Sequence, residues 1–380
     1  MKVFYWAPFL SNIATVDAVI KSINSINNYD KHKIFKPFII DSMGEWSSKE
    51  KKTNNINFIK LYNRKFYKYL PKGGYFKSRI SQGLIFFLSF FKLKKLITKE
   101  NPNFLIAHLI ISLPLLLFSI FNFKTKLIIR ISGTPKFNYV RKFFWKILSK
   151  KVYKVTCPTI STYKILKKLE IFSEDKLEIL YDPVISVREI NKKKFEPIEK
   201  RFQNSKFILG IGRLTKQKNF ELLIRAFLKV KNHLPDHELI ILGEGEQRSD
   251  LEKLIYSQQL EEKIYLLGHK SNVFSYLKKA TCFISSSLYE DPGFALIEAG
   301  FLNKIVFAAD SNTGPSEILN MSERGILFKN KNHDDLAQKI IDFSSLEKNE
   351  IKSKIFRLKY YSKNFTLFSH FKKLNQILIS

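Results

Sequence analysis

Cysteine is scarce in this chain, which has only two in 380 residues. Cys157 and Cys282 lie far apart in the sequence, and each stands among apolar neighbours. This pattern is typical of small buried side chains in a reducing compartment and gives no support to a disulfide framework. The start of the chain lacks a basic segment followed by an apolar stretch and a cleavage site, and residues 1–9 resemble a strand. We therefore expect a cytoplasmic protein.

Acidic residues are few where basic residues are many. Residues 1–200 carry 38 Lys and Arg against 14 Asp and Glu, a net charge of +24, and residues 201–380 carry 27 against 20, a net of +7. Residues 51–150 contain 21 basic residues and a single acidic one, Glu100. A Lys-rich composition alone would act on both halves alike. We therefore expect the first half to meet an anionic partner, with lipid head groups, a pyrophosphate-linked acceptor and nucleic acid as candidates.

The length and the residue pattern predict two α/β domains. A chain of 380 residues exceeds the usual size of one domain. Strand and helix patterns alternate along it, which favours doubly wound parallel sheets. We predict two Rossmann-like domains facing each other across a cleft. The first covers residues 1–187, a linker covers 188–205, the second covers 206–363, and a helix over 364–380 returns to the first domain.

Short apolar segments next to turn residues are the predicted strands. In the first half they are 2–7, 34–40, 56–61, 104–107, 126–131, 152–157 and 177–180, with a helix over about 15–27. In the second half they are 207–211, 239–242, 264–267, 282–284 and 305–308, the last clear strand. Ligands of such sheets bind outside the carboxyl ends of the strands, so the loops that follow these segments are the places to search for a site.

Three segments of the first half have more than one interpretation. Residues 62–78 are basic and aromatic; we expect a mobile loop that is simply solvated, binds nucleic acid by stacking, or lies on a membrane interface. Residues 80–97 are apolar almost all round and then basic, which indicates a buried helix or one partly in the membrane interface. Residues 104–123 raise the question of a transmembrane helix, but a His and a Pro interrupt them. We predict strand, loop and buried helix there.

Two predicted strand ends carry residues suited to binding. His108 follows the segment 104–107, and although a lone His is commonly structural, this position makes it a candidate. The segment 207–211 is followed by a loop with Gly212, Arg213 and Lys218 and then by a helical pattern. A glycine-bearing loop with cations before a helix is an anion site, although this one matches neither the Walker A nor the Gly-x-Gly-x-x-Gly pattern.

The most informative stretch is residues 281–300, TCFISSSLYEDPGFALIEAG. A short apolar strand is broken by serines, a Glu-Asp-Pro-Gly turn follows, and a helix begins at Phe294. Glu290 and Glu298 stand eight positions apart, one at the exit of the strand and one in the helix. Two carboxylates and several free backbone N–H groups at one sheet edge outline a sugar-nucleotide site.

From residue 206 to about 342 the chain closely resembles the nucleotide-binding half of family 4 glycosyltransferases, which have the two-domain GT-B fold. The resemblance is carried by GIGRLTKQKNFELLIRAF, IILGEGEQRSDLE, YLLGHKSNVFSYLKKATCFISSSLYEDPGFALIEA and TGPSEIL. Four motifs in the right order, with the Glu-x7-Glu spacing intact, are a specific signature. The first half resembles the family less closely, but its LIAHL and IIRISGTPK loops look like those of members that build cell-surface polysaccharide.

The resemblance implies a role for each matched side chain. Arg213 and Lys218 match the pair that holds the donor diphosphate. Glu290 matches a carboxylate near the hydroxyls of the transferred sugar, and Glu298 matches one that accepts from the ribose hydroxyls. His108 matches the His near the reacting centre, where it would contact the donor sugar.

Around the donor the resemblance also implies backbone contacts. The stretch after Gly293 would supply backbone N–H groups and apolar walls through Phe294, Ala295 and Leu296. The matched glycines of the donor site are Gly212, Gly243 and Gly268. The acceptor side departs from the family pattern, because Arg130 stands where many members have a smaller polar residue and Ser132 where many have a His.

The reaction implied is transfer of a sugar from a nucleotide donor with retention of configuration, and with no enzyme carboxylate as covalent nucleophile. No Asp-x-Asp occurs in the chain, in agreement with metal-free catalysis. We expect a uridine diphosphate sugar first and a guanosine diphosphate sugar second, with no further cofactor. The expected acceptor is a lipid-linked or cell-surface glycan, such as a lipopolysaccharide O-antigen, at the inner membrane face. Nucleic acid is not expected as a partner.

Two other functions stay open at this point. A sugar-nucleotide 2-epimerase has the same fold but no acceptor, so it leaves the basic first half unexplained. A non-catalytic basic protein that binds membrane or nucleic acid leaves the donor motifs without a use. Donor turnover by Lys218→Ala and Glu298→Ala variants separates these alternatives from a transferase.

Overall fold

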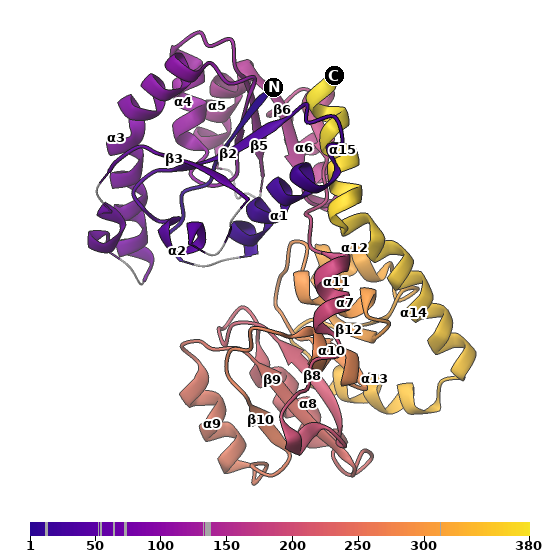
Figure 1. The fold of residues 1–380 in the computed structure, drawn as a ribbon. Coiled ribbons are helices and arrows are strands. Elements are labelled where there is room, and N and C mark those ends of the chain that lie inside the picture. Colours follow the sequence, from indigo (N-terminus) through magenta and orange to yellow (C-terminus); the bar gives the residue numbers. More distant parts are fainter. Residues whose placement is uncertain are drawn as a thin grey trace. The chain divides into compact units, whose positions relative to one another are not determined.

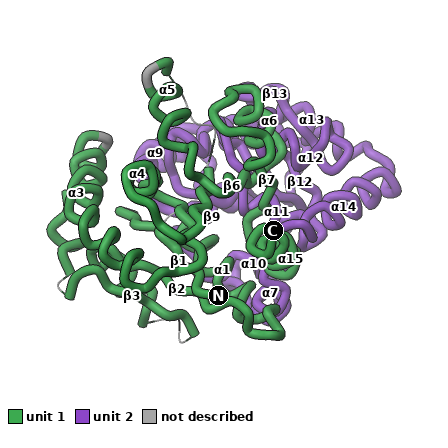
Figure 2. The backbone as a smooth tube through the Cα atoms, turned by 90° about the horizontal axis from the view of Figure 1, so that it is seen from above, with its two compact units in different colours: residues 1–183, 367–380 green, residues 184–366 purple. Residues whose placement is uncertain are grey.

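The computed structural model describes residues 1–11, 14–51, 53, 55–63, 65–71, 74–131, 133, 138–311 and 313–380 (Figure 1). The contacts divide the chain into two compact units (Figure 2): unit 1 consists of Met1–Pro183 and Leu367–Ser380, and unit 2 of Val184–Thr366. These limits differ by a few residues from those that the sequence predicts.

The segment 188–205 is not a plain linker. It belongs to unit 2 and contains most of helix α7 (Val187–Lys193) and the 3-10 turn η4 (Lys200–Phe202). Phe202 is buried, and its ring centroid lies 5.1 Å from that of Tyr265. A few apolar side chains in a mostly charged stretch are enough to fold it onto the unit, and this is why the polar composition misled the prediction.

Seven parallel strands form the sheet of unit 1, in the order β3-β2-β1-β4-β5-β6-β7. The strands are β1 (Lys2–Trp6), β2 (Lys36–Asp41), β3 (Asn57–Lys60), β4 (Phe104–Ala107), β5 (Lys126–Arg130), β6 (Val152–Cys157) and β7 (Leu177–Ile179). Strands β1, β4 and β5 are buried along almost their whole length, as apolar runs covered on both faces should be. The strand order reverses between β1 and β4, which places a topological switch point at their carboxyl ends.

Helices cover both faces of this sheet. Helix α1 (Ala14–Tyr29) packs beside the C-terminal helix α15 (Leu367–Ile379) on one face (Figure 1). The other face carries α3 (Tyr75–Glu100), α4 (Ser112–Ile120), α5 (Tyr139–Leu148) and α6 (Ile160–Leu169). The remaining short elements are α2 (Ser47–Glu50), η1 (Phe66–Tyr69), η2 (Ser149–Lys151) and η3 (Glu174–Lys176).

The predicted loop over 62–78 is wrong in part. Its end is the first turn of α3, and Phe66–Tyr69 form a 3-10 turn that the backbone N–H of Tyr67 ties to the carbonyl of Met43 at 2.8 Å. Residues 64, 72 and 73 lie outside the described part. The strand, loop and helix predicted over 104–123 are present as β4 and α4. Among the described residues no helix is both long and apolar enough to cross a membrane.

Unit 2 has a six-stranded parallel sheet in the order β10-β9-β8-β11-β12-β13. The strands are β8 (Lys206–Ile211), β9 (His237–Leu242), β10 (Ile264–Leu266), β11 (Cys282–Ser285), β12 (Ile305–Asp310) and β13 (Ile326–Lys329). The helices are α8 (Phe220–Val230), α9 (Arg248–Ser257), α10 (Phe274–Lys279), α11 (Phe294–Phe301), α12 (Gly314–Leu319), α13 (His333–Ser345) and α14 (Lys348–Ser362), and η5 spans Lys363–Phe365. Strand β13, an edge strand of four residues, is not among the predicted strands.

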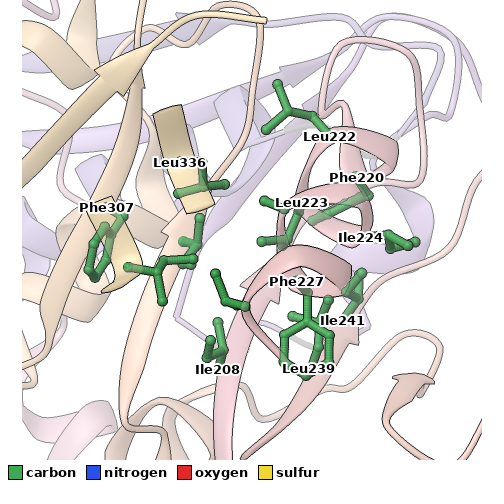
Figure 3. Packing of buried hydrophobic residues seen from close by; sticks show 14 of the residues in the cluster. Ile208, Phe220, Leu222, Leu223, Ile224, Phe227, Leu239, Ile241, Phe307 and Leu336 are labelled. Carbon is green, nitrogen blue, oxygen red and sulfur yellow. The ribbon is translucent and has the colours of Figure 1, made fainter. Parts of the chain in front are cut away.

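The apolar core of unit 2 includes helix α8, the helix that follows the loop after β8 (Figure 3). Phe220, Leu223 and Phe227 of helix α8 are buried in one cluster with strand residues and with Leu336 of α13. Each such buried side chain contributes roughly 1.5–3 kcal/mol of hydrophobic stabilisation. The loop between β8 and α8 is therefore anchored at both ends by buried elements.

Candidate active site

The main candidate site lies where the strand order of unit 2 reverses. Strand β8 pairs with β9 on one side and with β11 on the other. The loops that leave β8 and β11 therefore separate at the carboxyl edge of the sheet, the usual ligand position in such folds. These loops are residues 212–219 and 286–293, and they carry Arg213, Lys218 and Glu290.

Lys218 and Glu290 meet across the switch point. Their side chains form an ion pair and are only 20% and 13% exposed. The same carboxylate oxygen accepts from the Ser287 hydroxyl at 2.8 Å. The structure thus brings together two residues that are 72 positions apart and that the sequence analysis assigned to neighbouring parts of the donor.

Three further hydrogen bonds join the two loops. The Ser286 hydroxyl donates to the carbonyl of Lys218 at 2.8 Å. The backbone N–H of Leu288 donates to the carbonyl of Gln217 at 2.8 Å, and the Gln217 side-chain amide donates to the carbonyl of Tyr289 at 3.0 Å. The ion pair therefore sits on a framework that fixes both backbones, and it can change partners without the loops coming apart.

The predicted donor glycines lie in the framework beneath the pair. A Cβ on Gly212 would lie 3.0 Å from the side chain of Lys218, so this glycine makes room for the lysine stem. Gly243 has φ +147°, and a Cβ there would lie 1.8 Å from the carbonyl oxygen of Gly212. The N–H of Gly243 donates to the carbonyl of Gly268 at 2.8 Å. Steric packing therefore explains why glycine occupies both positions: Gly243 lies against the backbone of Gly212, and Gly212 lies against the side chain of Lys218.

Helix α11 points its first turn toward the same edge. Gly293 precedes the helix with φ +103°, a conformation that favours glycine. The first N–H groups of a helix have no partner within it and attract anions. Phe294 and Ala295 are half-buried, whereas Leu296 is buried, so any contribution of Leu296 rests on its backbone. The predicted apolar wall therefore reduces to the first two residues.

Glu298 and Arg213 complete the predicted donor set. Glu298 lies in the second turn of α11, four residues after Phe294 and half-buried; residues with this spacing share one face of a helix. Arg213 is exposed, and no described residue pairs with it. The two predicted diphosphate cations thus differ, because Lys218 already has a carboxylate partner and Arg213 extends into solvent.

In unit 1 the candidate is His108, directly after β4 at the switch point of that sheet. It is 7% exposed, and its Nδ1 atom is buried without a hydrogen-bond partner in the described part of the chain. Burial, and then the charge of Arg130 and that of His370 when it is protonated, hold the pKa of His108 well below its usual range. The imidazole is therefore neutral at physiological pH and suited to hydrogen bonding rather than to acid catalysis.

Arg130 is a buried structural cation. Its guanidinium makes a two-pronged contact with Asp182, with Nε donating at 2.9 Å and Nη2 donating to the other oxygen. Both side chains are at most 4% exposed. The sequence analysis singled out Arg130 but missed Asp182, and nothing short of the fold connects residues 52 positions apart. Ser132, the other departure from the family pattern, lies outside the described residues.

The described residues hold no group of three or more His, Cys, Asp or Glu side chains placed to bind a metal ion. The partners that sequence reasoning missed in the donor loops are Gln217 and Ser287. A signal for them was present, because three consecutive serines follow β11 immediately before the first Glu. Hydroxyl groups at a strand exit commonly bind nearby backbone or carboxylate groups.

Comparison with known proteins adds a family to this geometry. Residues 191–363 match the family described as glycosyl transferases group 1. An uncharacterized glycosyltransferase of Methanocaldococcus jannaschii is 35% identical over 248 residues, 60% of this chain and 61% of that protein. The N-acetylgalactosamine-N,N'-diacetylbacillosaminyl-diphospho-undecaprenol 4-alpha-N-acetylgalactosaminyltransferase of Campylobacter jejuni is 32% identical over 231 residues, 59% of this chain and 61% of that protein. The matches thus span about three fifths of each curated relative.

A solved structure is similar along the whole chain. HepE of Anabaena, in complex with UDP and glucose, superposes with a TM-score of 0.74 at 15% identity, covering 100% of this chain and 99% of that one. At this identity the likeness shows the fold alone. The strand orders of both units, the matched motifs of unit 2 and this likeness agree: residues 191–363 match the group 1 glycosyltransferase family, and the chain has the GT-B fold.

Proposed function

We propose that the chain transfers a sugar from a nucleoside diphosphate donor to a lipid-linked or cell-surface glycan, with retention of configuration. The observation that carries this proposal is the Lys218–Glu290 pair at the switch point of unit 2. A cation and a carboxylate are held there beside the first turn of α11. This arrangement offers one partner for phosphate oxygens and one for sugar hydroxyls.

Bond breaking leaves charge on the nucleoside diphosphate. When the bond from the anomeric carbon to the diphosphate breaks, the leaving oxygen gains negative charge, which Lys218 and Arg213 would stabilise together with the α11 N–H groups. Turning Lys218 toward a phosphate releases Glu290 to accept from a sugar hydroxyl. Glu298, one helical turn deeper, would accept from the ribose. His108 would contact the donor sugar as a neutral hydrogen-bonding group.

The names of similar proteins support the choice of substrates. HepE was solved with UDP and glucose, so a uridine diphosphate sugar is our first choice of donor and a guanosine diphosphate sugar the second. The Campylobacter relative is named for a diphospho-undecaprenol acceptor. A lipid-linked acceptor would require the protein to work at a membrane, and we place it at the inner face.

Helix α3 supports the membrane part of the proposal. Its exposed apolar side chains recur every three or four residues and therefore form one stripe: Phe76, Ile80, Leu84, Phe87, Leu88 and Phe91. Phe87 and Phe91 are 75% and 74% exposed. Lysines of the same helix lie over neighbouring rings, with Lys94 Nζ 3.9 Å from the ring centroid of Phe121. Apolar rings among lysines suit the head-group region of an anionic bilayer.

Helix α5 repeats the pattern in a part of the chain that the sequence analysis left without a function. Tyr139, Phe143, Phe144 and Ile147 are exposed, and Arg141 and Lys146 stand among them. Within the segment 51–150 only one residue, Glu100, is acidic. We propose that α3 and α5 carry the contacts to anionic lipid, in place of the loop 62–78 alone.

The donor proposal is tested by offering the purified protein a panel of nucleotide sugars and following release of the nucleoside diphosphate with a glycan or lipid-linked acceptor. Lys218→Ala should lower turnover by about a hundred-fold, as removal of one charge-stabilising group does in other enzymes. Glu298→Ala should raise the donor KM. The matched controls are Lys253→Ala and Glu261→Ala, both exposed in the same unit. Equal turnover by parent and site variants would show that the site is wrongly assigned, and sugar isomerisation without acceptor would indicate an epimerase.

The membrane proposal is tested by sedimentation with phosphatidylcholine vesicles that do or do not contain phosphatidylglycerol. We expect binding only to the anionic vesicles, weaker as salt rises. A Phe87→Ser/Phe91→Ser variant should bind less well, whereas Phe356→Ser, equally exposed but in α14 of unit 2, should bind like the parent. Equal binding to neutral and anionic vesicles would exclude the electrostatic part.

A further inference from the structure

A chain of hydrogen bonds runs through the interior of unit 1 and ends beside His108. The Tyr5 hydroxyl lies 3.0 Å from the Ser22 hydroxyl, which lies 2.9 Å from Nε2 of His370. The Nδ1 atom of His370 lies 2.7 Å from the carbonyl oxygen of Tyr181. The side chains that form these hydrogen bonds are all buried: Tyr5, Ser22 and His370. It joins β1, α1, α15 and the segment after β7.

The direction of every bond in this chain follows from its last member. A carbonyl oxygen only accepts, so Nδ1 of His370 carries the proton, and Nε2 of the neutral ring must accept. Ser22 therefore donates to His370, and Tyr5 donates to Ser22. Burial raises the pKa of Tyr5 and lowers that of His370 to about 4, so both keep these protonation states at neutral pH. These hydrogen bonds therefore have only one possible set of proton positions.

A second buried contact, the Arg130–Asp182 pair, lies on the other side of His108 and is joined to the first set through the backbone. The residue after Tyr181 is Asp182, whose carboxylate accepts hydrogen bonds from the guanidinium of Arg130 at the end of β5. Strand β4 lies between β1 and β5 in the sheet, so His108 is flanked by Tyr5 on one side and Arg130 on the other. The ring centroids of Tyr5 and His108 are 5.8 Å apart, with the planes tilted by 31°. We call the set Tyr5, Ser22, His370, Asp182 and Arg130 the polar belt.

We infer that the polar belt positions the imidazole of His108 for contact with the donor sugar, and that Tyr5 and His370 are its positioning residues. This inference rests on the proposed function. Apolar packing has no directional preference, whereas the hydrogen bond from the Tyr5 hydroxyl to Ser22 fixes the orientation of the ring. The Asp182 carboxylate likewise keeps the Arg130 guanidinium in one place. His108 has no hydrogen bond of its own through Nδ1 in the described part of the chain, so these flanking groups determine where its ring lies.

The inference gives the C-terminal helix a role beyond covering the sheet. Leu374, Ile377 and Leu378 pack into the apolar core with α1. His370 is the buried polar residue on that side of α15 and reaches residues 189 and 348 positions earlier in the chain. A helix that served packing alone could carry an apolar residue at this position.

The test compares Tyr5→Phe, His370→Phe and the double variant with the parent protein. Tyr5→Phe removes a single hydroxyl and retains the ring, so it keeps the test valid if His370→Phe does not fold. We expect each variant to lower kcat about ten-fold with little change in the donor KM, because small displacements of reacting groups are costly. The double variant should be no worse than the poorer single variant, since both changes break one chain. Lys372→Ala, exposed on the same helix, is the control.

A second measurement separates positioning from mere stability and does not depend on activity. In protein labelled with 15N-histidine, the imidazole resonances of His108, identified by their loss in His108→Gln, should move in Tyr5→Phe. Variants that lower Tm but leave kcat and these resonances unchanged would show that the belt serves the fold alone. If the parent turns over no nucleotide sugar, the proposed function fails, and the His108 resonances still decide the inference about the belt.

Discussion

Lys218 and Glu290 form a half-buried ion pair that links the loop after β8 to the loop after β11. The pair lies on a framework of backbone and serine hydrogen bonds, so it does not itself hold the loops together. A donor diphosphate and Glu290 would compete for the same ammonium group. The affinity for nucleotide and the rate of transfer should therefore respond differently to a change at Glu290.

Glu290→Gln should bind UDP at least as tightly as the parent protein while transferring sugar more slowly. The amide keeps the hydrogen bond from Ser287 but no longer competes for Lys218. Calorimetric titration with UDP and a transfer assay measure the two effects. A loss of UDP affinity in this variant would contradict the competition, and Glu261→Gln is the exposed control.

Gly243→Ala should destabilise unit 2 by about 3 kcal/mol, the upper range for overpacking a tight site. The new Cβ would lie 1.8 Å from a backbone oxygen, and the backbone has φ +147°. Gly83→Ala is the matched control, because nothing lies within 4 Å of a Cβ built there. Gly83 lies inside α3, so alanine should stabilise the protein by about 0.5–1 kcal/mol. Urea denaturation followed by circular dichroism measures both changes.

Asp182→Ala should cost about 3–5 kcal/mol, because it leaves the buried guanidinium of Arg130 without its carboxylate. The double variant Arg130→Met/Asp182→Leu should recover most of this loss, since an apolar pair of similar size avoids burying an unpaired charge. Denaturant unfolding of the three proteins tests this. A double variant as unstable as Asp182→Ala would mean that the packing around the pair, and not the charge, determines its effect.

Glu45 should make unit 1 less stable as the pH rises from 6.5 to 8. Burial, and then the charge of Asp41, raise the pKa of Glu45 to about 8. The folded protein thus holds a proton that the unfolded chain loses above about pH 4.3, and this stabilisation disappears as the pH rises toward 8. Buried His370, with a pKa of about 4, and His108, with a pKa well below its usual range, have the opposite effect, which fades as the pH rises above about 6.5.

Burial also lowers the pKa of Lys304 in unit 2 to about 8, which has the opposite effect as the pH nears 8, so the difference between the parent and Glu45→Gln over the window from pH 6.5 to 8 isolates the carboxyl group. The free energy of unfolding, measured in urea, should fall across it with a slope of at most about 1.4 kcal/mol per pH unit. Glu45→Gln should flatten this dependence. A Glu45→Gln variant with the same pH dependence as the parent would show that Glu45 is ionised in the fold.

The local parts of the site could be predicted from sequence because short-range chemistry specifies them. The apolar run of β11, the turn before Gly293 and the start of α11 are neighbours in the chain, and each has its own propensity signal. The spacing from Glu290 to Glu298 followed directly. The loop of Gly212 and Lys218 was recognised for the same reason. Strand β13 was missed, because four residues at a sheet edge give too short a pattern.

Only the tertiary structure decided which side chains contact each other. Sequence pattern indicated that Lys218 and Glu290 face one ligand, but not that they would pair with each other across 72 positions. It singled out Arg130 and His108 without their surroundings, since Asp182, Tyr5 and His370 come from other strands and from the last helix. Periodicity and propensity act over a few residues, whereas buried polar partners are chosen by the order in which strands join the sheet. Hence the sequence by itself determined the elements and the kind of chemistry, and the fold determined which groups meet.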